Sequence, residues 1–125
     1  MSVIDSHIHL FQRPYTHIWP NNHIKFGPEG EAALYETYRQ AYDIEAAFVV
    51  GYQGAPWTEN NAYIGALAAE RRWILPLGYL EPHPGRAPAI AQQLDVQGFF
   101  GASCYCYPHS EVPEWLGAPS MDALW

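Results

Sequence analysis

The amino-acid sequence predicts an α/β fold built on a parallel sheet of about four strand–helix units. Short apolar runs alternate with segments in which apolar residues recur at helical spacing, as is typical of parallel α/β proteins. The run at 46–50 is continuously apolar, which fits a strand buried on both faces. The stretch at roughly 11–29 carries Pro, Asn and Gly and therefore predicts a long loop after the first strand.

The elements follow in a regular order. A strand is expected at 2–10, a helix at 31–42 with acidic residues in its first turn, and the second strand at 46–50. A helix from about residue 60 to residue 72 comes next, with Asn60 or Asn61 as its cap. The third strand covers 74–80 despite Pro76, which is unusual in a strand. A short helix at 88–95 precedes a fourth strand within 96–107.

The end of the sequence predicts that a fourth helix only begins. Ser120 is a good helix cap, and an apolar stripe starts after it with Met121, Leu124 and Trp125. A closed TIM (β/α)8 barrel takes about 250 residues, whereas this chain has 125. We therefore expect residues 1–125 to form a single partial domain, the N-terminal half of a TIM barrel, truncated at the start of the fourth helix.

The composition argues against two classes of binding partner, nucleic acids and membranes. The formal net charge is −7 and Lys25 is the only lysine, which argues against nucleic acid, because phosphate backbones require basic patches. No apolar run approaches the roughly 20 residues that cross a bilayer, so no membrane partner is expected. The two cysteines, Cys104 and Cys106, are too close along one strand for a disulfide and are expected in the core, which favours a cytoplasmic location.

The first strand carries the strongest candidate for chemistry. Side chains two apart on a strand share a face, so Asp5, His7 and His9 are expected to point one way and Ile8 and Leu10 the other. Imidazoles at the carboxyl end of a barrel strand are suited to a divalent metal, with Asp5 as an outer partner of the ligands. The loops at the same rim supply four candidates for substrate contact: His17, Trp19, Trp57 and Glu81.

The segment Asp5-Ser6-His7-Ile8-His9-Leu10-Phe11 resembles the first-strand signature of the amidohydrolase-related family of metal-dependent hydrolases and decarboxylases. Looser similarity continues at 48–52, 60–63 and 76–82. The resemblance implies that His7 and His9 bind one divalent metal. Zinc is the first expectation, and manganese, iron and cobalt are the alternatives. The predicted fourth strand contains no lysine, so the resemblance points to a mononuclear site or to one of the relatives that work without metal.

The resemblance also implies a function. The expected substrates are small carboxylated, lactone or amide compounds, and the general base is expected in the half of the barrel that this chain lacks. The chain alone is then expected to be inactive. The alternative is a non-enzymatic half-barrel module that homodimerises, with or without a bound metal, since pairing would cover the open face of a four-stranded sheet.

Overall fold

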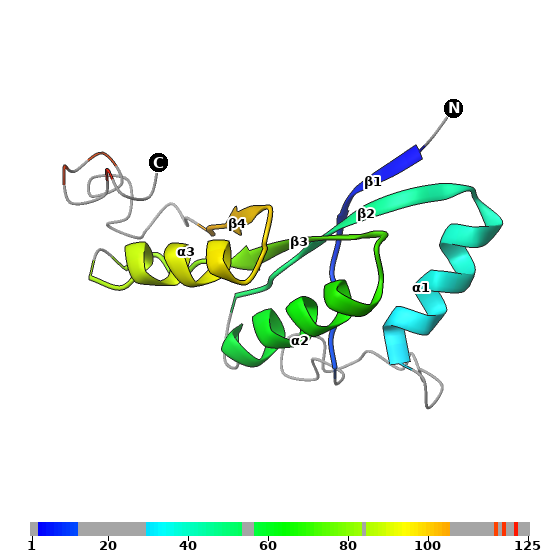
Figure 1. Ribbon diagram of the computed structural model, residues 1–125, viewed down its shortest axis with the longest axis horizontal. Coiled ribbons are helices and arrows are strands. Elements are labelled where there is room, and N and C mark those ends of the chain that lie inside the picture. Colours follow the sequence, from blue (N-terminus) through cyan, green and yellow to red (C-terminus); the bar gives the residue numbers. More distant parts are fainter. Residues whose placement is uncertain are drawn as a thin grey trace.

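The computed structural model describes residues 3–12, 30–53, 57–83 and 85–105, together with residues 117, 119 and 122. Its strands and helices alternate along the chain (Figure 1). In order they are β1 (Val3–Ile8), α1 (Gly30–Ala41), β2 (Ile44–Val50), α2 (Trp57–Glu70), β3 (Ile74–Tyr79), α3 (Ala87–Val96) and β4 (Gly101–Ser103). The residues expected to begin a fourth helix, Ser120, Met121, Leu124 and Trp125, lie outside the described part.

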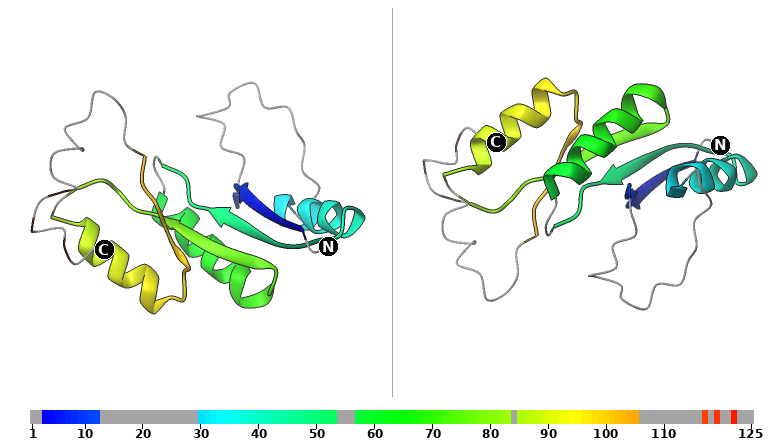
Figure 2. Two further views of the ribbon diagram at one scale, coloured as in Figure 1. Left: turned by 90° about the horizontal axis from the view of Figure 1, so that it is seen from above. Right: turned by 90° about the horizontal axis from the view of Figure 1, so that it is seen from below.

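The four strands form one sheet in the order β1-β2-β3-β4, and each neighbouring pair is parallel. This confirms the predicted α/β fold with a parallel sheet. All three helices lie on one face of the sheet, and the views from above and below in Figure 2 show that the described residues leave the other face without a helix. The fold therefore has one covered face and one open face.

The core lies between the sheet and the helices. Ala47 and Val49 of β2 pack in one buried cluster with Ile64 and Leu67 of α2 and with Ile74 of β3. Ile8 and Leu10 contribute to the same cluster, as the alternation of the first strand predicted. Burial of this apolar surface is the main stabilising contribution to such a layer.

Pro76 sits in the middle of the sheet, where proline normally removes a ladder hydrogen bond. Its carbonyl accepts from the Phe100 N–H at 2.9 Å, so its nitrogen also faces the β4 side. The β3–β4 ladder starts one residue later, at the pair Leu77 and Gly101. The missing N–H therefore falls just outside the ladder, which explains why the strand tolerates proline.

Helix α2 begins three residues earlier than the expected caps. Asn60 and Asn61 are not helix caps but lie inside the helix with buried side chains, so that prediction was wrong. Their amides hydrogen-bond to neighbouring strand ends rather than to the start of α2. Among the described residues, no helix has the length and apolar character to cross a membrane.

Candidate metal centre

His7 and His9 meet at the carboxyl end of β1. Their Nε2 atoms lie 3.2 Å apart, and the ring planes are nearly perpendicular with centroids 4.9 Å apart. His7 is exposed, whereas His9 is half-buried. Because Ile8 and Leu10 belong to the core under the helices, the two imidazoles that alternate with them lie on the open face of the sheet.

The protein fixes the tautomer of His9. Its Nδ1 lies 2.7 Å from the Val50 carbonyl oxygen at the end of β2, and a carbonyl can only accept, so Nδ1 carries the proton. The Nε2 atom of neutral His9 is then an acceptor, directed at His7. Burial lowers the pKa of His9 and nearby His7 lowers it further, while the bond to Val50 acts in the opposite sense. The neutral ring, which is the form that binds metals, is favoured.

The separation of the two nitrogens suits a shared metal. Two imidazole nitrogens at zinc–nitrogen distances of ~2.0–2.1 Å in a tetrahedral site lie about 3.3 Å apart, close to the 3.2 Å between His7 and His9. Without a metal, the same distance accommodates a hydrogen bond from His7 Nε2–H to His9 Nε2. Metal binding at this pair would therefore displace that proton from His7.

Asp5 does not share the face of the two histidines. Asp5 pairs with Ala47 of β2, whereas Ile8 pairs with Val49, and a register shift separates these two pairs. Asp5 therefore lies in phase with Ile8, on the covered side of the sheet. Its Oδ2 accepts from the Tyr35 hydroxyl of α1 at 2.8 Å, and its Oδ1 accepts from the His7 backbone N–H at 3.2 Å. The expectation that all three side chains point one way was wrong, because the irregularity in β1 breaks the two-residue period.

The bond to Asp5 also affects Tyr35. Burial raises the pKa of the Tyr35 hydroxyl, and the hydrogen bond and negative charge of Asp5 raise it further. Tyr35 therefore stays protonated and donates to Asp5. Through Asp5, helix α1 is connected to the backbone of His7.

Aromatic rings surround the buried side of the pair. Tyr52, which follows β2, makes an edge contact with His9 at 5.2 Å, and the Phe11 ring lies 6.0 Å from His9. Tyr105, which follows β4, contacts both Tyr52 and Tyr79 at the ends of the two central strands. The imidazole pair thus lies at one end of a row of rings along the carboxyl edge of the sheet.

Two buried asparagines hold this edge together, and the sequence alone had suggested only a capping role for them. Asn60 donates to the Leu10 carbonyl at 2.9 Å and accepts from the Tyr52 N–H at 3.2 Å, which joins the ends of β1 and β2. Asn61 makes both hydrogen bonds to the backbone of Tyr79. The signal that could have revealed this role is a pair of adjacent amides directly before the apolar part of a helical stretch.

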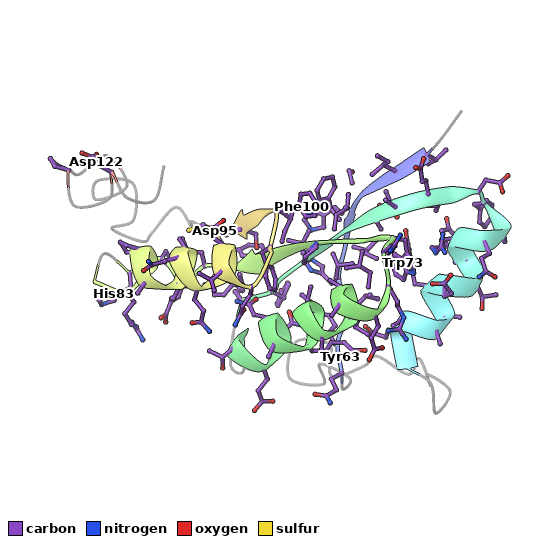
Figure 3. The ribbon with its side chains drawn as sticks, viewed as in Figure 1. Tyr63, Trp73, His83, Asp95, Phe100 and Asp122 are labelled. Atoms are coloured by element: carbon purple, nitrogen blue, oxygen red, sulfur yellow. The ribbon has the colours of Figure 1, made fainter. Side chains whose placement is uncertain are left out.

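The other candidates fall outside the histidine pair. Glu81 forms an ion pair with Arg86 at 3.0 Å. Trp57 opens α2, and its side chain lies outside the described residues, as do His17 and Trp19. Cys104 is exposed, so its expected place in the core was wrong, and Cys106 is not described. His83 lies exposed just before α3, far from β1 along the sheet (Figure 3).

In the described part of the chain, no group of three or more His, Cys, Asp or Glu side chains converges on one point. The geometry there therefore supplies two ligands. Comparisons with protein-family models, curated proteins and solved structures found no match for the chain.

Proposed function

We propose that this chain is the metal-binding, N-terminal half of a TIM-barrel hydrolase of the amidohydrolase type, with His7 and His9 as ligands of one zinc ion. The observation that carries the proposal is the Nε2 pair at 3.2 Å, with the proton of His9 held on Nδ1 by Val50. Both nitrogens lie on the open face at the carboxyl end of β1, where barrel enzymes build their active sites.

The arrangement of the layers supports the half-barrel part of the proposal. Four parallel strands in sequential order, with all three described helices on one face, are consistent with half of a (β/α)8 barrel. In a closed barrel the open face becomes the interior. The two histidines would then point into the barrel mouth rather than into solvent.

When bound, a divalent metal lowers the pKa of a coordinated water and polarises a substrate carbonyl. The residues of this chain would orient and shield it. The Val50 carbonyl orients the ring of His9, and the Tyr35–Asp5 pair holds the backbone of His7. The rings of Phe11 and Tyr52, which contact the ring of His9, would shield that side of the metal from solvent.

The substrate class and the general base come from the resemblance of the first strand. The proposed substrates are small carboxylated, lactone or amide compounds. Hydrolysis is the preferred reaction class, and decarboxylation is the alternative. The general base and further ligands would come from residues beyond the described ones. A single copy of the chain should then bind metal without turnover.

Cobalt binding tests this proposal, because Co²⁺ replaces zinc and reports its ligands by visible absorption. We expect d–d bands with the full chain, and at least a tenfold weaker response with His7→Ala and with His9→Ala. His83→Ala is the matched control, since His83 is an exposed histidine away from the pair. Equal cobalt spectra for all four proteins would overturn the proposal. Hydrolysis of small lactones by the monomer would overturn the proposal that the catalytic residues are divided between this chain and the other half of the barrel.

A further inference from the structure

The large apolar side chains that are exposed lie at the two ends of the βα layer. In the described residues they occur on β1, on or just after α1, at the end of α3 and just before β4, whereas β2, α2 and β3 in the middle carry none. They are Val3, Ile4, Leu34, Tyr38, Tyr42, Val96 and Phe100. Phe100 is 69% exposed and lies beside the start of β4 (Figure 3).

The same two ends carry the edges of the sheet. Within the described chain, β1 has a neighbour on one side, β2, and β4 has a neighbour on one side, β3. An unpaired strand edge next to exposed apolar side chains is a surface that a partner strand can cover. A partner that presents a single edge would leave the other end exposed, so a partner that covers both ends must itself present two edges.

A second copy of this chain can cover both ends at once. A twofold rotation about an axis along the strands preserves their direction, so β1 of each copy comes beside β4 of the other and the pairing stays parallel. Two seams form together, with eight strands in one closed ring and the helices outside. Closed twofold symmetry of this kind is the commonest form of protein oligomer.

We propose that two copies of this chain pair edge to edge, β1 against the partner's β4, and bind one zinc ion between their two histidine pairs. The zinc part of this proposal rests on the function proposed above. In the closed ring, β1 of one copy and β1 of the other occupy opposite positions, first and fifth. The interior of an eight-stranded barrel is just wide enough to be filled by side chains, so side chains from opposite strands meet there.

The shared site follows from the two-ligand geometry of each copy. His7 and His9 supply two nitrogens, and the described residues supply no third ligand near them. Two copies supply four imidazoles, which complete a tetrahedral zinc site with no open position for water. The homodimer is therefore a metal-holding form without turnover.

Sedimentation velocity and native mass spectrometry of the full chain with zinc test the proposal. We expect a species of twice the 14.1 kDa chain mass that carries one zinc ion per two chains. Phe100→Glu places a charge on an edge and should weaken dimerisation at least tenfold. Ala66→Glu is the matched control, because it adds the same charge at an exposed position on the central helix α2. Val96→Glu provides a second edge variant if Phe100→Glu fails to fold.

The double variant His7→Ala/His9→Ala separates the two parts of the proposal. It should still dimerise through its edges while losing zinc. A wild type that stays monomeric in the presence of zinc would overturn the edge pairing, and a dimer with one zinc per chain would overturn the shared site. A dimer that binds no zinc would overturn the shared site and the proposed function but leave the edge pairing standing.

Discussion

The central strands and the edge strand β1 are built differently, although both belong to one parallel sheet. In β2 and β3, most residues that face the helices are buried, and Val49 is fully buried. In β1 no residue is fully buried, and Val3 and Ile4 are about half exposed. The strand that carries His7 and leads directly into His9 is therefore less covered than the central strands.

The comparison shows that stability and chemistry are divided between the regions. Apolar packing alone holds most of the centre, whereas β1 and the residues after it combine the apolar contacts of Ile8 and Leu10 with several polar contacts. These polar contacts are Tyr35 to Asp5, His9 to Val50, Asn60 to Leu10, and Glu31 to the Phe11 N–H. Changes in the centre should affect the free energy of unfolding most, and changes around β1 should affect the site.

The largest effect on stability is expected at Gly51, which directly follows β2 and bonds to β3. A Cβ there would lie 2.8 Å from Asn61 Oδ1 and 2.9 Å from the Gly78 backbone carbon, so Gly51→Ala should lower the free energy of unfolding by at least about 3 kcal/mol. Gly101→Ala on β4 is the control, since its Cβ would meet only Leu77 at 3.4 Å. Urea unfolding measures both, and similar losses would contradict the comparison.

A pair of matched valines tests the comparison directly. Val49→Ala removes two buried methyl groups and should cost about 2–3 kcal/mol, whereas Val3→Ala should cost under about 0.5 kcal/mol. Both should be measured by urea unfolding in the Phe100→Glu background, which keeps β1 uncovered. A loss at Val3 as large as that at Val49 would show that β1 is not an exposed edge.

A smaller effect is expected at Tyr35, which connects α1 to the site. Tyr35→Phe removes the hydroxyl that donates to Asp5 and should cost about 1 kcal/mol. Because Asp5 also accepts from the His7 backbone, zinc affinity should fall severalfold as well. Tyr38→Phe on the same helix is the control. Unchanged zinc affinity in Tyr35→Phe would limit the Tyr35–Asp5 pair to a role in stability.

The smallest expected effect is a pH dependence of the free energy of unfolding that originates at Glu31. Burial raises the pKa of the Glu31 carboxyl, and the Phe11 N–H only partly offsets this. The folded chain therefore keeps this proton to higher pH than the unfolded chain, so the contribution of Glu31 to stability is full below its ordinary pKa and is lost as pH rises through the raised one. Glu31→Gln should remove that loss, and urea unfolding at pH 4 and pH 7 checks it. A steeper loss in the variant would contradict the sign.

Much of the fold could be predicted because its signals are local. Continuous apolar runs marked β2 and β3, and helical spacing marked α1, whose observed bounds differ from the expected ones by one residue at each end. The start of α2 was missed because Asn60 and Asn61 bond to strand ends that are distant in sequence. Such tertiary hydrogen bonds leave no periodic signal.

The site was predictable in part for the same reason. The two-residue spacing of His7 and His9 was enough to place both on one face, and the structure brings their Nε2 atoms together. Asp5 left that face because of a register shift against β2, which the sequence of β1 alone does not encode. The role of Tyr35 depends on a hydrogen bond to Asp5, which lies 30 residues away in the sequence, so it could only be seen in the structure.

The imidazole nitrogens of the full chain give the most direct test of the metal site. Long-range ¹H–¹⁵N NMR of the labelled chain, recorded before and after zinc addition, reports the protonation and metal binding of each ring. We expect His9 to carry its proton on Nδ1 throughout, and the Nε2 signals of His7 and His9 to shift on zinc binding while His83 stays unchanged. Unshifted His7 and His9 signals with zinc bound elsewhere would contradict the account.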